Sequence, residues 1–350
     1  MGKTVGIFIG RFMPLHKGHE EIIEKAKKEF DEVIVIIGSS DNTITLRNPF
    51  DIETRIKMFQ HIEGINILTI ENSNYDFEWW KQEINNIVNQ WCENQDVESI
   101  SLIGCKKYSD SYWLDHFPQW KFWNVGKLEN DINATDIRDG YFTFCEDLKD
   151  YHSEFAGVVW REMVSDPVSE VMISWRITDE FKRLRKELRF IKEYKKSWEG
   201  SPFPPIFTTV DALVLHKDKI LIIERGQNPG KGKLSLPGGF IGEYEYLLDA
   251  AIRELKEETN IECSENQLKQ AFVKSKVFDD PYRDPRGRMI THVHLFDLNK
   301  ICYDLTEINV KAGDDAGSAK WMTGEEIDEN KKNFSGDQYR IICNMLNKIK

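Results

Sequence analysis

The sequence of 350 residues contains no long hydrophobic run. Its longest purely aliphatic stretch, Val33 to Ile37, is far shorter than the roughly 20 apolar residues of a membrane-spanning helix. The chain begins with a strand-like segment, Thr4 to Ile9, where a secreted protein would carry a signal peptide. We therefore expect a cytoplasmic protein with no membrane partner.

Cysteine and proline are also scarce. The six cysteines lie far apart, without the paired short spacings of a zinc site or the density of a disulfide scaffold. With 11 prolines and 40% hydrophobic residues, the composition is typical of a folded globular protein and not of a disordered one. We expect reduced thiols at Cys92, Cys105, Cys145, Cys263, Cys302 and Cys343.

Positive charge is in deficit, because 47 Lys and Arg face 59 Asp and Glu, and the net charge is -12. Such a chain repels polyanions, so we expect no nucleic-acid partner. Any phosphate site must then be built from a few local groups. The length exceeds what one hydrophobic core usually organises, which predicts two domains.

The first third of the chain alternates short β-branched runs with helical stretches. This alternation predicts a Rossmann-like α/β domain with a doubly wound parallel sheet and with ligands at the carboxyl ends of its strands. The predicted strands are 4–9, 33–38, 65–70 and 99–104, and the predicted helices are 19–30, 52–62 and 77–91.

An amphipathic helix is predicted at 178–198, where apolar residues recur at helical spacing among many charges. The Pro-rich segment 201–205 cannot continue this helix. We therefore predict a first domain at 1–195, a linker at 196–205 and a second domain at 206–350, and a cut at the Pro-rich segment is expected to give two active fragments. In the second domain we predict strands at 207–215, 219–224 and 290–298, and helices at 246–259 and 337–349.

Three carboxylates share one narrow face of the predicted helix at 246–259. Residues Glu254, Glu257 and Glu258 fall within one sector when each residue advances by about 100°. Their mutual repulsion favours a hard cation such as Mg²⁺, which takes oxygen ligands and bridges to phosphates. Taken alone, the pattern is more often a solvated helix face.

The flanking residues change that interpretation. Leu236-Pro237-Gly238-Gly239, Glu245 and Arg253-Glu254-Leu255-Lys256-Glu257-Glu258 resemble the Nudix box closely, with Asn260 where the family usually has Gly. Asn tolerates the left-handed conformation, so this departure should cost little. The resemblance implies an α+β Nudix domain, an α/β/α sandwich with a mixed sheet, in which Arg253 and Glu245 pair to hold the loop. It implies a metal site at Gly238, Glu254, Glu257 and Glu258, with the three glutamates as catalytic residues.

Three arginines lie within the six residues 283–288. The side chains of Arg283, Arg286 and Arg288 suit a substrate with two phosphates and a terminal phosphate or ribose. This stretch resembles the loop of ADP-ribose pyrophosphatases in the Nudix superfamily, as does 314–321. We expect the three arginines to bind ADP-ribose, with a charged hairpin turn as the alternative.

A second motif lies at the end of the first predicted strand, where Gly10-Arg11-Phe12-Met13-Pro14-Leu15-His16-Lys17-Gly18-His19 precedes a helix. Glycines let the backbone approach a phosphate, the helix start offers free N–H groups, and two imidazoles add donors. Its place at the ligand-binding edge of a parallel sheet favours a phosphate site over an incidental pair of histidines.

This run resembles the His-x-Gly-His signature of the nucleotidyltransferase superfamily, and Ile132-Asn133-Ala134-Thr135-Asp136-Ile137-Arg138 resembles its later ATP-binding motif. In that family the histidines and the late arginine stabilise the triphosphate while a substrate phosphate attacks in line, so positioning and charge provide the catalysis. The implied catalytic residues are His16, His19 and Arg138. The implied ATP-binding residues are Gly10, Arg11, Phe12, His16, Gly18, His19, Asn133, Thr135 and Arg138.

Further segments resemble the archaeal-type nicotinamide mononucleotide (NMN) adenylyltransferases. They are Arg47-Asn48-Pro49-Phe50, Arg55 and Phe117-Pro118-Gln119-Trp120. We expect Arg47, Trp79 and Trp80 to bind NMN, with core packing as the alternative for the two tryptophans.

The order of the motifs over nearly the whole chain resembles the family of bifunctional NMN adenylyltransferase and ADP-ribose pyrophosphatase proteins. We expect the first domain to make NAD and pyrophosphate from ATP and NMN, in pyridine nucleotide biosynthesis. We expect the second to hydrolyse ADP-ribose to AMP and ribose 5-phosphate, and both domains to use Mg²⁺ or alternatively Mn²⁺. Another nucleotidyltransferase as first domain, a non-hydrolytic ADP-ribose or NAD sensor as second domain, and a homo-oligomer stay open as alternatives. The intact glutamates argue against the sensor.

Overall fold

The computed structural model describes residues 2–39, 43–71, 75–104, 115–130, 132–143, 160–301, 308–313 and 316–347. The chain divides into two compact units, Met1–Arg185 and Lys186–Lys350. The division falls inside helix α7 (Asp179–Lys196), ten residues before the predicted end of the first domain at 195. The domain limits drawn from the sequence therefore stay a proposal, and each unit is described by itself.

The first unit contains a five-stranded parallel sheet with the strand order β3-β2-β1-β4-β5. Strand β1 pairs with β2 on one side and with β4 on the other, so the direction of winding reverses beside β1. In such sheets ligands bind at the carboxyl edge next to this reversal. The strands are β1 (Lys3–Gly10), β2 (Glu32–Ile37), β3 (Asn66–Thr69), β4 (Val97–Gly104) and β5 (Lys121–Asn124).

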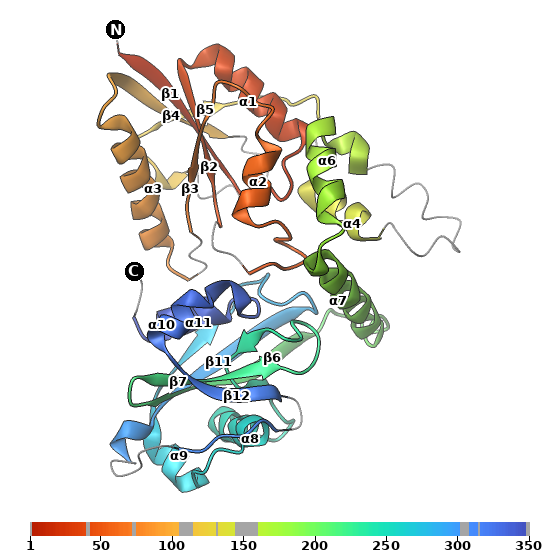
Figure 1. Cartoon of the computed structure of the whole chain (residues 1–350), viewed down its shortest axis with the longest axis vertical. Coiled ribbons are helices and arrows are strands. Elements are labelled where there is room, and N and C mark those ends of the chain that lie inside the picture. The colour runs from red at the N-terminus through yellow and green to blue at the C-terminus, as the bar shows by residue number, and fades with distance from the viewer. Residues whose placement is uncertain are drawn as a thin grey trace. The chain divides into compact units, whose positions relative to one another are not determined.

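Helices cover both faces of this sheet, with α1 and α2 on one side and α3 on the other (Figure 1). Alternate residues of β1 point to opposite faces. Val5, Ile7 and Ile9 pack in one buried cluster with Ile84 and Val88 of α3. The arrangement confirms the predicted doubly wound fold. The helices are α1 (Lys17–Glu29), α2 (Ile52–Met58), α3 (Phe77–Cys92), α4 (Ala134–Thr143) and α6 (Asp166–Trp175), followed by α7.

The second unit contains a mixed seven-stranded sheet with the main order β10-β11-β6-β7-β12. Strands β6 and β11 run parallel over ten residue pairs, whereas β6 and β7, β7 and β12, and β10 and β11 are antiparallel. Short strands β8 and β9 pair with β7 and β6. The strands are β6 (Ile206–His216), β7 (Lys219–Arg225), β8 (Leu234–Ser235), β9 (Gly238–Phe240), β10 (Phe272–Phe278), β11 (Arg288–Asp297) and β12 (Ala316–Thr323).

The mixed sheet lies between α8 and α9 on one face and α10 and α11 on the other (Figure 1). Helix α8 buries Ala250, Ala251 and Leu255 against Val210 and Leu221 of the sheet. This sandwich confirms the predicted α+β class. The helices are α8 (Leu247–Thr259), α9 (Glu265–Ala271), α10 (Gly324–Glu329) and α11 (Gln338–Met345), with 3-10 turns at Leu298–Lys300 and Lys331–Asn333.

The predicted helix at 337–349 ends at Met345, because Asn347 takes a left-handed backbone conformation with φ of 51°. The predicted helix at 52–62 likewise ends at Met58. Each difference is at the end of an element, where helical hydrogen bonds are fewest.

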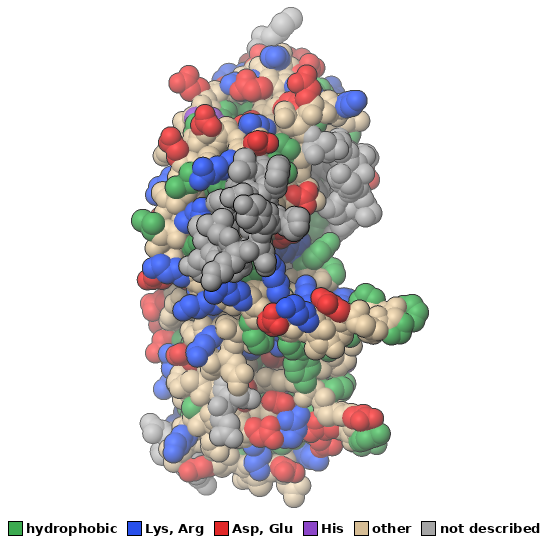
Figure 2. Space-filling model, turned by 90° about the vertical axis from the view of Figure 1, so that its right-hand side faces the viewer, with side chains coloured by type: hydrophobic (Ala, Val, Ile, Leu, Met, Phe, Trp, Pro, Cys, Tyr) green, Lys and Arg blue, Asp and Glu red, His purple; other side chains and the backbone are tan. Residues whose placement is uncertain are grey.

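The surface mixes charges of both signs, as the face shown in Figure 2 illustrates. Within the described residues, no helix combines the length and hydropathy that crossing a membrane requires. Three cysteines in the described part of the chain are free thiols, namely Cys92, Cys263 and Cys343. Cys105, Cys145 and Cys302 lie outside the described residues.

Candidate active sites

The turn from β1 to α1 brings the two histidines of the first motif together. His16 caps α1, and its Nδ1 accepts a hydrogen bond from the backbone N–H of His19 at 3.4 Å. The two imidazole rings stack with their centroids 3.5 Å apart. Because Nδ1 of His16 is an acceptor, the proton of the neutral ring lies on Nε2, where it can donate to a ligand.

Burial keeps both imidazoles uncharged. It lowers the pKa of His16 to about 4. Burial also lowers the pKa of His19 well below its ordinary value, and the adjacent His16 lowers it further. At neutral pH these rings are therefore hydrogen-bond donors and not cations.

The glycines and the phenylalanine of this motif shape the turn. A Cβ at Gly10 would lie 2.8 Å from the Phe12 ring, and one at Gly18 would lie 2.8 Å from the carbonyl oxygen of Asn130. Phe12 has a φ of 52° and is buried, and its ring packs edge-on against His19 at 4.9 Å between centroids. Phe12 thus packs against the imidazole of His19 and limits its movement.

Helix α4 carries the late motif to the same edge of the sheet. Arg138 donates hydrogen bonds to the carbonyl oxygen of Met13 at 2.8 Å and to the hydroxyl of Thr135 at 3.0 Å. The side-chain oxygen of Asn133 accepts from the Thr135 backbone N–H at 2.9 Å. Burial, with the positive charge of Arg11 nearby, lowers the pKa of Arg138 to about 10. Arg11 and Arg138 therefore lie close enough to interact, and Arg138 is hydrogen-bonded to the turn that carries the imidazoles.

Arg55 of α2 holds this edge in shape. Its buried guanidinium donates to the carbonyl oxygens of Arg11 at 2.9 Å, Gly38 at 2.6 Å and Ser39 at 2.7 Å. It ties the carboxyl ends of β1 and β2 together. The sequence singled out Arg55 through a resemblance alone, without this role.

The residues predicted to bind NMN are placed differently from one another. Arg47 precedes Asn48, whose side-chain oxygen accepts from Arg11 at 3.2 Å, so it lies near the histidine motif. Trp80 packs against the core between the sheet and α3, with its ring 6.1 Å from that of Phe117. Trp79 is half-buried on the same helix. The contacts of Trp80 agree with the alternative that this tryptophan packs in the core.

In the second unit, Arg253 organises the loop that precedes α8. Its guanidinium donates to both carboxylate oxygens of Glu245, at 2.8 Å and 2.9 Å, which confirms the predicted pair. The same side chain contacts Glu254 at 2.8 Å and Glu257 at 2.9 Å. Arg253 lowers the pKa of Glu245.

Glu254 and Glu258 sit partly buried against the glycine loop. Glu258 accepts a hydrogen bond from the backbone N–H of Gly238 at 2.8 Å. A Cβ at Gly239 would lie 2.6 Å from the Glu254 carboxylate, so a side chain there would displace that carboxylate. Burial raises the pKa of Glu254, and it raises the pKa of Glu258 to about 7.

These glutamates suit a divalent cation chemically. Burial makes the charged form of these two carboxylates unfavourable and raises their pKa values. A cation beside them would stabilise the charged form again. Within the described residues, however, no three His, Cys, Asp or Glu side chains are already gathered as a metal centre. Arg253 instead contacts Glu254 and Glu257, and the side chain of Glu257 is 59% exposed.

The end of α8 is held by the backbone that follows η2 (Leu298–Lys300). Gly313 donates its N–H to the carbonyl oxygen of Glu258 at 2.9 Å, and Lys311 donates to that of Thr259 at 2.8 Å. A Cβ at Gly313 would lie 1.7 Å from the Glu257 carbonyl oxygen. Asn260 ends the helix with a φ of 43°, the left-handed conformation expected of it.

A cavity of about 470 Å³ opens beside the two glutamates. Arg283 and Arg286 line it, together with Gly238. Arg288 is not among its lining residues and instead contacts the carbonyl oxygen and carboxylate of Asp279. The structure therefore brings together two of the three predicted arginines.

The two arginines in the cavity differ in their partners. Arg283 forms a buried ion pair with Asp337, at 3.0 Å and 3.1 Å. Arg286 pairs with Asp284, and its guanidinium lies 5.7 Å from the centre of the Tyr194 ring and 5.3 Å from that of Phe240. Arg286 thus presents a flat cationic surface between aromatic walls.

Comparison with known proteins places both sites in one family. The NUDIX domain model matches residues 205–345, and the cytidylyltransferase-like model matches residues 7–140. The crystal structure of a bifunctional NMN adenylyltransferase/ADP ribose pyrophosphatase from Francisella tularensis, complexed with AMP and a Mn ion, is 33% identical with a TM-score of 0.87. The similarity covers 99% of this chain and 99% of that one. This chain belongs to that bifunctional family.

Single-domain relatives match each part of this bifunctional enzyme. The nicotinamide/nicotinic acid mononucleotide adenylyltransferase of Acinetobacter baylyi is 31% identical over 145 residues, which is 39% of this chain and 74% of the relative. The ADP-ribose pyrophosphatase of Methanocaldococcus jannaschii is 38% identical over 113 residues, which is 32% of this chain and 59% of the relative.

Sequence reasoning missed three residues at the cavity of the Nudix hydrolase. Asp211 of β6 and Arg225 at the end of β7 line it, and Glu187 of α7 contacts the loop beside it. Asp211 accepts from Thr291 and from Gln338, and burial raises its pKa. The available signals were weak, namely one carboxylate within the apolar run 210–215 and one glutamate on the apolar face of an amphipathic helix.

Proposed function

We propose that the first domain joins ATP and NMN to give NAD and pyrophosphate. The observation that carries this proposal is the gathering of Arg11, His16, His19 and Arg138 at the carboxyl edge of β1. A phosphate oxygen of NMN attacks the α-phosphorus of ATP in line, and the bond to the pyrophosphate oxygen breaks. Neutral imidazole donors and two arginines stabilise the charge that shifts onto the leaving pyrophosphate, without a covalent intermediate.

We propose that the second domain hydrolyses ADP-ribose to AMP and ribose 5-phosphate. Glu254, Glu257 and Glu258 with the carbonyl of Gly238 would hold divalent cations, and such cations would polarise the diphosphate and lower the pKa of a bound water. Arg286 binds the substrate phosphates, and Arg253 keeps the loop of Gly238 and Gly239 in place. The cation is proposed to be Mg²⁺ in both domains, with Mn²⁺, the ion named for the Francisella structure, as a substitute.

The cavity supports this substrate class because it combines charge with flat apolar walls. Acidic groups that attract a cation line the same cavity as Arg286, and the guanidinium of Arg286 lies near the rings of Tyr194 and Phe240. A dinucleotide-like diphosphate needs both features. The free thiols at Cys92, Cys263 and Cys343 suit a reducing compartment, and we propose the cytoplasm.

A product assay on the purified chain tests both activities. ATP with NMN is expected to give NAD and pyrophosphate, and ADP-ribose is expected to give AMP and ribose 5-phosphate, each with Mg²⁺ and not with EDTA. Phosphopantetheine, glycerol phosphate and flavin mononucleotide serve as rival acceptors, and NAD and other nucleoside diphosphates as rival hydrolase substrates. Preference for a rival would replace the proposal for that domain alone.

A further inference from the structure

The carboxyl-terminal half of α7 forms part of the hydrolase cavity. Phe190 and Tyr194 line it. Glu187 lies three residues after Leu184 and four before Ile191, which puts it on the buried stripe of the helix. The side chain is buried, with 4% of the residue exposed. A carboxylate on an apolar stripe is costly to bury unless hydrogen bonds compensate it.

Glu187 holds the loop between β7 and β8. Its Oε2 accepts a hydrogen bond from the backbone N–H of Gly230 at 3.1 Å. Gly230 has a φ of 77°, and a Cβ there would lie 2.5 Å from the hydroxyl of Ser335. Gly230 is therefore hydrogen-bonded to Glu187 and lies close to Ser335, which precedes α11.

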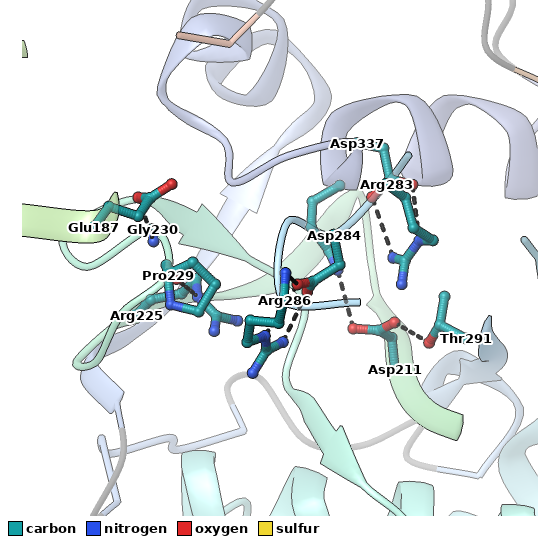
Figure 3. A network of polar contacts seen from close by, with 11 residues as sticks. Glu187, Asp211, Arg225, Pro229, Gly230, Arg283, Asp284, Arg286, Thr291 and Asp337 are labelled. Atoms are coloured by element: carbon teal, nitrogen blue, oxygen red, sulfur yellow. Dashed lines mark hydrogen bonds and ion pairs between the residues drawn. The ribbon is translucent and has the colours of Figure 1, made fainter. Parts of the chain in front are cut away.

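The same loop fixes Arg225. The carbonyl oxygen of Pro229, the neighbour of Gly230, accepts a hydrogen bond from Nε of Arg225 at 2.9 Å. Anchoring Nε leaves the two terminal nitrogens of the guanidinium directed away from the loop and toward Arg286 (Figure 3). Arg225 lines the cavity, and burial and the charge of Arg286 lower its pKa, whereas Glu258 and Asp284 raise it.

We propose that Glu187 is a positioning residue of the hydrolase and acts through the loop on Arg225. Glu187 holds Gly230, the carbonyl of Pro229 orients the guanidinium, and the terminal nitrogens of Arg225 bind the diphosphate of the substrate beside Arg286. This inference rests on the proposed hydrolysis of ADP-ribose. It makes α7, which precedes the Nudix fold in the chain, a functional part of the second site.

Binding and kinetics of single and double variants test the proposal in the full-length chain. Arg225→Ala removes charged hydrogen bonds and is expected to raise the KM for ADP-ribose about 10- to 100-fold. Glu187→Ala is expected to raise it about 3- to 10-fold, because Arg225 remains but is less well oriented. Glu187→Gln keeps an oxygen that accepts from Gly230, so it should restore most of the loss. Titration with ADP-ribose in EDTA should give dissociation constants that change in the same order.

The double variant separates positioning from general stability. If Glu187 acts through Arg225, adding Glu187→Ala to Arg225→Ala raises KM by less than 2-fold. Glu193→Gln, an exposed glutamate on the same helix, is the matched control and should leave KM unchanged. NAD synthesis should stay at the parent level in every variant.

Three results would overturn the inference. They are an unchanged KM in Glu187→Ala, a Glu187→Ala effect that is as large without Arg225 as with it, and a loss in Glu187→Gln equal to that in Glu187→Ala. A parent chain that binds ADP-ribose in EDTA but does not hydrolyse it with Mg²⁺ contradicts the proposed function. The dissociation constants of the variants then still test the role of Glu187. A parent chain that neither binds nor hydrolyses ADP-ribose overturns both.

Discussion

The two sites of this chain treat charge in opposite ways. Around β1, burial keeps His16 and His19 neutral and leaves the positive charge to Arg11, which contacts the side chain of Asn48, and to Arg138, which contacts the carbonyl of Met13. At the Nudix helix, burial acts on carboxylates and raises the pKa values of Glu254 and Glu258. The first site is thus built for an anion with donors already in place, whereas the second completes its charge balance with a cation.

The largest effect is expected when one carboxylate of the Nudix site loses its charge. Glu258→Gln keeps the size of the side chain and removes one negative charge, so a cation loses an oxygen ligand and activates water less well. ADP-ribose hydrolysis should fall by about 10²- to 10³-fold. NAD synthesis should remain near the parent level, because His16 and Arg138 belong to the other unit.

Both reactions should be measured on one preparation across a Mg²⁺ titration, after circular dichroism has shown that the variant is folded. Glu262→Gln, an exposed glutamate outside the cavity, is the control. Undiminished hydrolysis removes Glu258 from the metal site, and parallel loss of both activities means that the sites are not independent.

A matching change on the other side is His16→Ala. Without the Nε2 donor, kcat of adenylyl transfer should fall by about 10²- to 10³-fold, because the hydrogen bond matters most as charge moves onto pyrophosphate. Steady-state kinetics with ATP and NMN check this, and hydrolysis of ADP-ribose on the same sample is the control. A change confined to KM contradicts a role in the transition state.

A smaller effect concerns where the second site begins. The Pro-rich segment 201–205 alone predicts that a cut there leaves both activities intact, but the cavity takes part of its wall from α7. A chain that starts at 206 should therefore have a KM for ADP-ribose on the order of 10-fold higher than a chain that starts at 178. Equal KM values in two folded fragments would show that α7 is dispensable for hydrolysis.

The smallest effect is a difference in how pH changes stability. In the folded protein the pKa of His16 is lowered from 6.5 to about 4. Its contribution to the free energy of unfolding is therefore complete above about pH 6.5 and is lost as the pH falls toward 4. The folded pKa of Glu258 is raised from 4.5 to about 7, so in metal-free protein its contribution is complete below about 4.5 and is lost as pH rises through 7.

Calorimetry with EDTA and with Mg²⁺ tests this opposition. Mg²⁺ should raise the unfolding midpoint of the hydrolase more at pH 8 than at pH 6, because protons compete for Glu258 at the lower pH. In Glu258→Gln the dependence on pH between 6 and 8 should be weaker. An equal effect of Mg²⁺ on the unfolding midpoint at both pH values would contradict competition between protons and Mg²⁺ at Glu258.

The comparison of the sites also explains what sequence could and could not predict. The two histidines and the three Nudix glutamates are adjacent or about one helical turn apart in the sequence, so their positions on one face could be predicted from helix geometry. The contact of Glu257 with Arg253, which keeps it apart from Glu258, could not. That Arg138 belongs to the same site as the histidines was expected only through a family resemblance, and its hydrogen bond to the carbonyl of Met13, 125 residues earlier, was not predicted. The strands and helices of the first 104 residues followed from period and turn residues, with differences only at their ends.

Side-chain direction within loops could not be predicted. Arg283, Arg286 and Arg288 look equivalent in the sequence, yet only the first two line the cavity, and Arg288, the first residue of β11, turns to Asp279. Glu187 is one of many charges in α7, and its hydrogen-bond partner Gly230 lies in a loop more than 40 residues later. Such roles depend on long-range packing that no local pattern records.

The hydrogen bond from Gly313 to the end of α8 has a consequence for natural variation. The helix that carries Glu257 and Glu258 leaves no room for a side chain at position 313, because the nearest atoms are backbone. We expect a side chain at position 313 to force its own backbone and the backbone of Glu257 and Glu258 apart. Such a change should weaken the hydrolysis of ADP-ribose and leave the synthesis of NAD intact, because the two sites belong to different units.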